Sequence, residues 1–220
     1  MNAHQIEQLI NSYSMPKYCA TSPTKLHHLI GHLSSVVENN IPGDVIELGC
    51  FNGGSSIYVR AVLDALHSQK TFHVYDSWLG VPQPTEEDLF PPYQFQKGEV
   101  ASTRSNFENT FTERDLKLPV IHSGWFTEIP DAEYPNQIAF AFLDSDLYQP
   151  ILDSWIKIYT KLSPGAVVLL DDYGMMRTPG VKLACDAFLV DKPESIQQCS
   201  APYQAYCQPG FTGGAFLVKL

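Results

Sequence analysis

Basic residues are scarce in this chain. Its 220 residues include 14 Lys and Arg against 24 Asp and Glu, which gives a formal net charge of -10 at pH 7 and a pI near 5.0. Nucleic acids and anionic membrane surfaces attract proteins that carry basic patches. We therefore expect neither of them as the main partner, and the acidity is compatible with chemistry on a small molecule.

Long apolar runs and cysteine pairs are also missing. No apolar stretch approaches the ~20 residues that a bilayer-spanning helix needs, and residues 1–12 are polar and lack the apolar core of a signal peptide. The five cysteines are an odd number without a CxxC spacing, a pattern typical of neither a disulfide framework nor a zinc site. These absences predict a cytoplasmic protein with reduced thiols.

The sequence does contain an alternation of short apolar strands and amphipathic helices. Its apolar content of 44% is enough for one substantial core. Residues 163–165, Ser-Pro-Gly, are expected to close the helix that precedes them. The alternation predicts a single α/β domain with a mostly parallel, doubly wound sheet. Strands are predicted at 44–48, 71–75, 119–122, 138–143 and 166–170, and helices at 23–40, 55–68, 101–111, 149–162 and 180–189.

Two segments depart from this alternation. Residues 203–208 and 215–220, separated by a Pro-Gly turn, are expected to form an antiparallel hairpin. Residues 81–98 form a long irregular stretch rich in proline, aromatic and acidic residues. Loops of that length are uncommon unless they are functional or mobile. We predict that residues 79–98 form a lid over the site.

A glycine-rich turn follows the first predicted strand. The segment ELGCFNGG (47–54) places glycines where the backbone must turn sharply next to a ligand. Asp76 ends the next strand, and a carboxylate there can accept hydrogen bonds from both hydroxyls of a ribose. The turn has neither the GK[ST] of a phosphate-binding loop nor the GxGxxG of a dinucleotide site. The pattern favours a ligand with a ribose and no phosphate, and packing alone is the alternative.

Four aspartates follow two later strands. Asp144 and Asp146 come after the strand at 138–143, and Asp171 and Asp172 follow the strand at 166–170. If these strands are neighbours, the carboxylates converge, and like charges so close need a cation or a proton between them. Oxygen ligands suit Mg²⁺ or another hard divalent cation, which would lower the pKa of a substrate hydroxyl. Asp146 is our candidate base for the hydroxyl proton, with helix or turn capping as the alternative for any single aspartate.

Several of these segments together resemble one enzyme family. They are GDVIELGCFNGG (43–54), SGWF (123–126), LDSDLY (143–148), LSPG (162–165) and DDY (171–173). In this order they are similar to the macrocin O-methyltransferase family of metal-dependent class I S-adenosylmethionine methyltransferases, which act on natural-product sugars. The resemblance implies a Rossmann-like three-layer sandwich with a mostly parallel seven-stranded sheet and an N-terminal helical cap, all within one domain spanning residues 1–220.

The resemblance also implies roles for individual residues. Asp144, Asp171 and Asp172 match the ligands of Mg²⁺ or another divalent cation, and Asp146 matches the general base. The implied activity is methylation of a hydroxyl on a small molecule, a sugar or another natural product. The implied S-adenosylmethionine pocket, covered by Thr21 or Ser22, includes Glu47, Gly49, Gly53, Asp76, Ser77, Ser123, Gly124 and Trp125.

Other functions are compatible with parts of the same pattern. Residues 144–146 are also a DxD motif, which a metal-dependent nucleotide hydrolase or glycosyltransferase would use around a phosphate, but that interpretation leaves the glycine turn unexplained. A non-catalytic cofactor-binding subunit is a third candidate. We place none of the seven histidines in the site. The acceptor, the pathway and the oligomeric state stay open, a homo-oligomer included.

Overall fold

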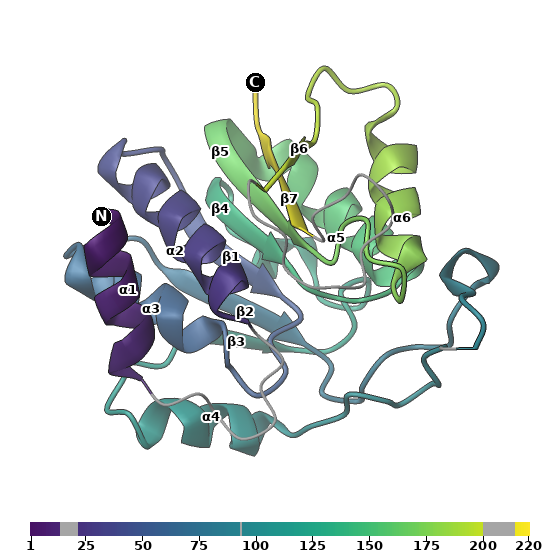
Figure 1. The fold of residues 1–220 in the computed structure, drawn as a ribbon, viewed down its shortest axis with the longest axis horizontal. Helices are drawn as coiled ribbons and strands as arrows, with labels where there is room; N and C mark the ends of the chain where they lie inside the picture. Colours follow the sequence, from purple (N-terminus) through teal and green to yellow (C-terminus); the bar gives the residue numbers. More distant parts are fainter. Residues whose placement is uncertain (14–21, 93, 200–213) are drawn as a thin grey trace.

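A seven-stranded sheet organises the computed structural model, which describes residues 1–13, 22–92, 94–199 and 214–220. The strand order is β3-β2-β1-β4-β5-β7-β6, and Figure 1 shows helices on both sides of the sheet. The first five strands in this order are parallel, whereas β7 is antiparallel to both β5 and β6. The strands are β1 (Asp44–Leu48), β2 (Phe72–Asp76), β3 (Val120–Ser123), β4 (Ile138–Leu143), β5 (Leu162–Asp171), β6 (Gln197–Gln198) and β7 (Gly214–Val218). The predicted mostly parallel sheet is confirmed.

Two apolar clusters, one on each face of the sheet, form the core. In β1, Val45 packs with α1, α2, α3 and α4, whereas Ile46 packs on the opposite face with α5 and α6. Successive side chains of a strand point to opposite faces, so a strand covered on both sides is apolar throughout, as β4 is. The helices are α1 (Ala3–Ser12), α2 (Pro23–Glu38), α3 (Ser56–Ala65), α4 (Arg104–Thr112), α5 (Tyr148–Ile158) and α6 (Pro179–Leu189), with single 3₁₀ turns η1 (Glu86–Asp88), η2 (Asp131–Glu133) and η3 (Tyr159–Lys161).

The predicted boundary between α5 and β5 is wrong. The helix ends at Ile158 and the strand begins at Leu162, so residues 163–165 lie inside the strand instead of closing the helix. The register of β5 against β4 shifts within this stretch. Gly165 has a φ of +82°, which suits an irregular position in a strand. Bulges accept proline and glycine where a regular ladder would not, which explains the turn-like sequence.

The C-terminal strand is antiparallel, as predicted. β7 lies between β5 and β6 and pairs with both of them. The strand expected at 203–208 lies outside the described residues. The antiparallel direction predicted for the last strand is therefore confirmed. The strand predicted at 203–208 stays a prediction.

The irregular segment 79–98 is attached to the rest of the domain through Asp88. This residue is buried, and its Oδ1 accepts a hydrogen bond from the backbone N–H of Tyr148, the first residue of α5, at 2.7 Å. A carboxylate at a helix N-terminus is favoured by the helix dipole and by the unpaired N–H groups there. Arg177 lies 4.8 Å from the ring centre of Phe95 in the same segment. Movement of this segment as a lid stays a prediction.

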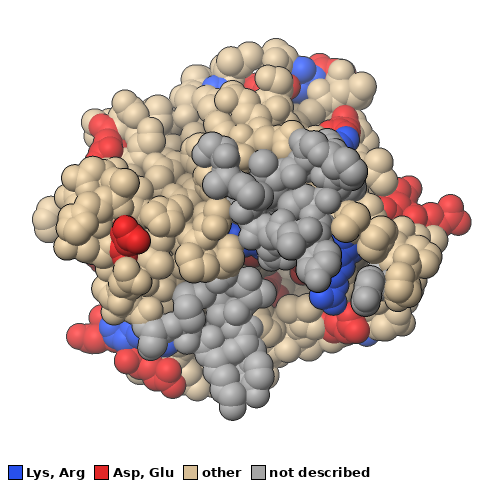
Figure 2. All heavy atoms as spheres, viewed as in Figure 1, with Lys and Arg blue, Asp and Glu red and all other residues tan. Residues whose placement is uncertain are grey.

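Charged side chains are scattered over the described part of the face shown in Figure 2. Lys and Arg form small separate groups there, most of them near Asp or Glu (Figure 2). This distribution differs from the continuous basic patch that is typical of a nucleic-acid-binding surface. Within the described residues, none of the helices combines the length and the apolarity needed to cross a bilayer.

An ion pair joins the end of the chain to the segment before β6. Glu194 accepts hydrogen bonds from the Nζ of Lys219 and from the hydroxyl of Tyr159, the second at 2.6 Å. Burial raises the pKa of Glu194, but these donors outweigh burial and lower the pKa from 4.5 to about 2. A carboxyl whose pKa is lower in the folded state stabilises the fold above about pH 4.5 and loses this contribution as the pH falls through about 2.

Replacing Glu194 with Gln is expected to lower the free energy of unfolding at pH 7 by about 1–2 kcal/mol, a range that allows for solvent screening near the surface. Urea unfolding at a series of pH values measures this, and the difference from the parent chain should shrink as the pH falls from about 4.5 towards about 2. Glu7→Gln, at an exposed position of α1, is the control and should change little. A difference that stays constant over this pH range would contradict the prediction.

Candidate active site

A cavity of about 550 Å³ opens at the carboxyl ends of the parallel strands. Its walls come from residues that follow β1, β2, β3, β4 and β5, and Val81 and Phe95 of the 79–98 segment line one side. Ligands of open α/β sheets bind at this edge, and the volume is typical of a small-molecule site. The glycine turn and the aspartates, which the sequence shows as separate motifs, therefore face a single cavity.

Gly49 follows β1 and brings its turn against the end of β4. Its φ is +87°, and a Cβ here would overlap the backbone carbonyl oxygen of Asp144. Glycine alone accommodates both this backbone conformation and this close approach. Gly49 lines the cavity, whereas Gly53 lies behind the wall, where a Cβ would come within 3.1 Å of the Phe107 ring. The turn thus shapes the cavity at one glycine and packs against α4 at the other.

Asp76, at the end of β2, is held by the glycine turn. Its Oδ2 accepts hydrogen bonds from the backbone N–H groups of Cys50 at 2.9 Å and Phe51 at 2.8 Å. Its Oδ1 accepts one from the N–H of Trp78 at 2.7 Å. An ionised carboxylate has about four acceptor positions, so about one remains for a ligand. Asp76 lines the cavity, and in this conformation it suits one ligand hydroxyl better than two.

Glu47 lies beneath the turn, outside the cavity wall. Its side chain is fully buried, and the hydroxyls of Ser55 and Ser56 at the start of α3 donate hydrogen bonds to its two carboxylate oxygens, the second at 2.6 Å. Burial raises the pKa of Glu47 to about 7, although the two hydroxyls act in the opposite direction. Ser55 lines the cavity, so any effect of Glu47 on a cofactor would be transmitted through the start of α3.

Of the other residues predicted for the cofactor pocket, some line the cavity and others do not. Three of them line the cavity, namely Ser77, Gly124 and Trp125. Ser123 is exposed at the end of β3. Ser22 caps α2, because its Oγ accepts a hydrogen bond from the N–H of Lys25 at 3.2 Å. Thr21 lies outside the described residues.

The four aspartates predicted for the metal end line the same cavity, namely Asp144, Asp146, Asp171 and Asp172. β4 and β5 are neighbours, and Leu143 pairs with Leu170, so the residues that follow the two strands meet at one edge of the sheet. Asp146 and Asp172 have φ values of 60° and 58°, a left-handed conformation that Asp tolerates better than most residues. The structure therefore brings together the carboxyl groups that follow the two strands.

Burial favours the protonated form of these carboxyl groups. It raises the pKa of Asp144 to about 7 and that of Asp146 to about 8, and neighbouring carboxylates add to both shifts. Burial also raises the pKa of Asp171 well above its usual range, with Asp144 as the next contribution. A cation placed among these groups would lower all three pKa values.

Lys25 supplies one such cation, and the sequence analysis missed it. This lysine lies in the first turn of α2, is buried, and donates from Nζ to Asp171 and to Asp172, the second at 3.2 Å. Burial lowers the pKa of Lys25, but the nearby carboxylates outweigh burial and hold the pKa well above its ordinary value. A cation in the first turn of a helix is disfavoured by the helix dipole. A lysine at this unfavourable position is the one sign in the sequence that Lys25 pairs with an acidic residue elsewhere in the fold.

The aspartates also have acceptor capacity for a metal ion. Asp171 Oδ1 is buried and has no hydrogen-bond donor among the described residues. Hard oxygen donors suit Mg²⁺, so the residues fit the divalent cation that the sequence predicts, with Lys25 beside it. Among the described residues, three His, Cys, Asp or Glu ligand atoms lie within 4.8 Å of one another at one place only, and the four aspartates are not part of it. Their carboxylates would therefore have to draw closer together around an ion.

Comparison with known proteins identifies the family. The family model described as Macrocin-O-methyltransferase (TylF) matches residues 11–197. Demethyldecarbamoylnovobiocin O-methyltransferase of Streptomyces niveus is 29% identical over 182 residues, which are 76% of this chain and 69% of that protein. The 8-demethyl-8-(2,3-dimethoxy-alpha-L-rhamnosyl)-tetracenomycin-C 4'-O-methyltransferase of Streptomyces olivaceus is 30% identical over 163 residues, 69% of this chain and 60% of that protein. The matched part of the chain thus spans about two thirds of the length of these relatives.

A solved structure shares the fold. The O-methyltransferase NovP is 25% identical, with a TM-score of 0.75 over 90% of this chain and 80% of that chain. The predicted class I methyltransferase fold is confirmed. Because the family model matches most of its length, the chain belongs to the macrocin-O-methyltransferase family.

Proposed function

We propose that this chain transfers a methyl group from S-adenosylmethionine to a hydroxyl of a natural-product sugar or a similar small molecule, and that a divalent cation assists. The observation that carries the proposal is that the glycine turn with Asp76 and the four aspartates share one cavity of about 550 Å³. The family match supports methyl transfer, and the names of the two relatives support the acceptor class.

The first half of the proposed site is the cofactor wall. Gly49 allows the backbone to approach the ligand closely, and Asp76 retains about one acceptor position for a ribose hydroxyl. Trp125 lines the same cavity and offers a flat ring that could stack on adenine. The net charge of -10 also favours a cationic methyl donor over an anionic nucleotide.

The second half is the proton acceptor. When the acceptor oxygen bonds to the methyl carbon, the carbon–sulfur bond breaks, its electron pair stays on sulfur, and the hydroxyl proton must leave. We assign this proton to the carboxylate of Asp146, which lines the cavity beside the other aspartates. Without a cation, burial and the nearby carboxylates raise its pKa to about 8. A cation bound beside it would lower this pKa, so that Asp146 is ionised and can accept the proton.

The metal end of the proposed site consists of Asp144, Asp171 and Asp172. When bound, the cation would supply a lower pKa for the acceptor hydroxyl. Asp171 Oδ1 is the atom that most needs a ligand, since it is buried without a donor among the described residues. Lys25 balances part of the negative charge of these carboxylates from the other side.

Methyl transfer is expected to stop in EDTA and to return on addition of Mg²⁺, because the aspartates would then regain the ion that lowers the hydroxyl pKa. Transfer of labelled methyl groups from S-adenosylmethionine to a panel of natural-product glycosides measures this. The same assay after addition of Mg²⁺-saturated EDTA controls for other effects of the chelator. Full activity in EDTA would remove the metal from the proposal and leave methyl transfer intact.

Thermal shift separates this proposal from the DxD alternative. S-adenosylhomocysteine at 100 times its Kd is expected to stabilise the chain by about 2.7 kcal/mol, and nucleoside diphosphates with Mg²⁺ should not stabilise it. The measurement needs no acceptor, so it can be made before the substrate is known. Stabilisation by nucleoside diphosphates alone would contradict the proposal.

A further inference from the structure

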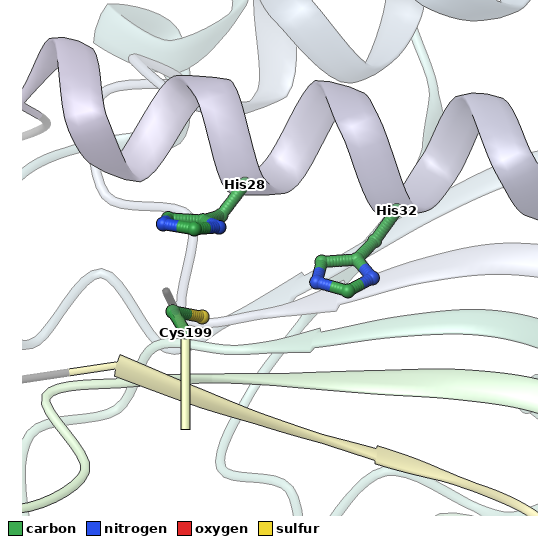
Figure 3. Close-up of side chains that lie close together, drawn as sticks. All are labelled: His28, His32 and Cys199. Atoms are coloured by element: carbon green, nitrogen blue, oxygen red, sulfur yellow. The ribbon is translucent and has the colours of Figure 1, made fainter. Parts of the chain in front are cut away.

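Three metal-ligating side chains meet outside the cavity. They are His28 and His32 on α2 and Cys199 directly after β6, and their ligand atoms all lie within 4.8 Å of one another. Figure 3 shows both imidazoles projecting from the helix towards the thiol. Cys199 is buried, and the two histidines are partly buried. This His-His-Cys cluster has no part in the chemistry proposed above.

The positions of these residues suit metal binding. His28 and His32 are four residues apart, so they lie on one face of α2, one turn from each other. The sequence analysis placed none of the histidines in a metal site and overlooked this HxxxH spacing. The cysteine that completes the group is far away in the chain. The fold supplies it, since the backbone N–H of Cys199 donates to the carbonyl of Gly214 at 3.0 Å and so seats this residue on β7.

The donor set points to a particular class of metal. Two imidazole nitrogens and one thiolate are typical ligands of Zn²⁺, whereas Mg²⁺ takes oxygen. Zinc bonds of about 2.0–2.3 Å place tetrahedral ligands ~3.5 Å apart. The three atoms, which lie within 4.8 Å of one another, would therefore draw together only slightly on binding. We infer that His28, His32 and Cys199 form a second metal site, distinct from the aspartates, for Zn²⁺ or a similar thiophilic divalent cation.

The surroundings of the cluster support this inference. The ring centres of His28 and His32 are 6.4 Å apart, and His32 packs against the ring of Phe216 on β7 at 4.2 Å. Burial and the neighbouring His28 lower the pKa of His32 to about 4, so its imidazole is neutral at pH 7. A neutral imidazole is the form that binds metal. Three protein ligands would leave one position of a tetrahedral ion for a water molecule or a further group.

A metal ion in the cluster would link α2 to the residue that follows β6, and both lie near the active site. Lys25, His28 and His32 follow one another along one side of α2 at spacings of three and four residues, and Lys25 reaches the aspartates. On the other side, the Gly214 that Cys199 contacts pairs with Asp171 of β5. The ion would therefore hold the helix carrying Lys25 against the strands carrying the aspartates.

Cobalt substitution tests the inference directly. The full-length chain is freed of metal and titrated with Co²⁺ in excess Mg²⁺, which keeps the oxygen-rich aspartate site filled. We expect one equivalent of Co²⁺ to produce a thiolate-to-cobalt charge-transfer band, and Zn²⁺ to displace it. Cys199→Ser should abolish the band and weaken Co²⁺ binding on the order of 100-fold. Cys185→Ser changes a buried sulfur that accepts a hydrogen bond from the indole N–H of Trp155 on the other face of the sheet, and it should leave the band unchanged.

Two further variants complete the test. His28→Gln should weaken Co²⁺ binding and keep the charge-transfer band at saturating metal, because the thiolate remains a ligand. Asp144→Asn should leave both unchanged, which would show that the aspartates are a different site. Melting of the metal-free variants checks that each one folds, and Zn²⁺ should raise the Tm of the parent chain but not of folded Cys199→Ser. A parent chain without the band, or a band that survives Cys199→Ser, would overturn the inference.

Discussion

Asp146→Asn is expected to lower kcat by about 10²–10⁴-fold, the range typical for loss of a general base. Asparagine keeps the size of the side chain but cannot take the hydroxyl proton. Asp146 lines the cavity at the metal end, whereas the cofactor contacts proposed above lie at the glycine turn and Asp76. Steady-state methyl transfer and calorimetric titration with S-adenosylhomocysteine should therefore show a large loss of turnover with little change in cofactor affinity.

A matched surface variant controls for the change of charge. Asp64→Asn alters an aspartate that is half exposed on α3 and pairs with Arg60, and it should leave turnover near that of the parent chain. If Asp146→Asn kept near-normal turnover with the physiological acceptor, the base would have to be sought elsewhere. If it lost S-adenosylhomocysteine binding to the same extent as turnover, Asp146 would be assigned a structural role.

Lys25→Met is expected to lower the free energy of unfolding by about 3–5 kcal/mol in the absence of divalent metal. The ammonium of Lys25 is the cation that contacts Asp171 and Asp172, so its removal leaves buried carboxylates without a counter-charge. These carboxyls will then be protonated more easily. Ionisation of Asp144 stops destabilising the parent above its pKa of about 7, whereas the variant, whose pKa is higher, continues to lose stability. The deficit should therefore grow as the pH rises above about 7.

Metal binding gives the Lys25 variant a second, independent readout. If Lys25 and Mg²⁺ neutralise the same carboxylates, Mg²⁺ should stabilise Lys25→Met more than it stabilises the parent chain. Chemical unfolding with and without Mg²⁺ measures both effects. Lys182→Met, which removes a partly exposed ion pair with Asp186 on α6, is the control, and it should cost less than about 1 kcal/mol with no response to Mg²⁺. Equal stabilisation of both variants by Mg²⁺ would show that Lys25 and the metal act on different groups.

The elements of the sheet are predictable because each carries a local signal. The buried strands are short apolar runs. At the active site each of them ends in Asp76 or Asp171 or is followed at once by Gly49 or Asp144, so the carboxyl edge of the sheet is visible in the sequence. The prediction of where α5 ends and β5 begins was wrong for a local reason as well. The Ser-Pro-Gly sequence at this boundary is typical of a turn, and only pairing with β4 reveals that the backbone continues as a bulged strand.

The candidate site is predictable in part. The aspartates at the ends of β4 and β5 converge because the two strands are neighbours, which the alternation of strands and helices made a reasonable expectation. Glu47 shows the limit of such reasoning. Its position in the motif suggests contact with a cofactor, whereas its burial and its bonds to Ser55 and Ser56 depend on how α3 packs over β1.

By itself, the sequence determined the parallel sheet, the glycine turn and the acidic residues at the strand ends, since each depends on neighbours in the chain. The tertiary structure decided which side chains complete these features. Lys25 meets Asp171 across 146 residues of sequence, and Cys199 meets two histidines on α2 across a similar span. Contacts of this kind leave no periodic trace, because their partners are brought together only when the helices pack on the finished sheet.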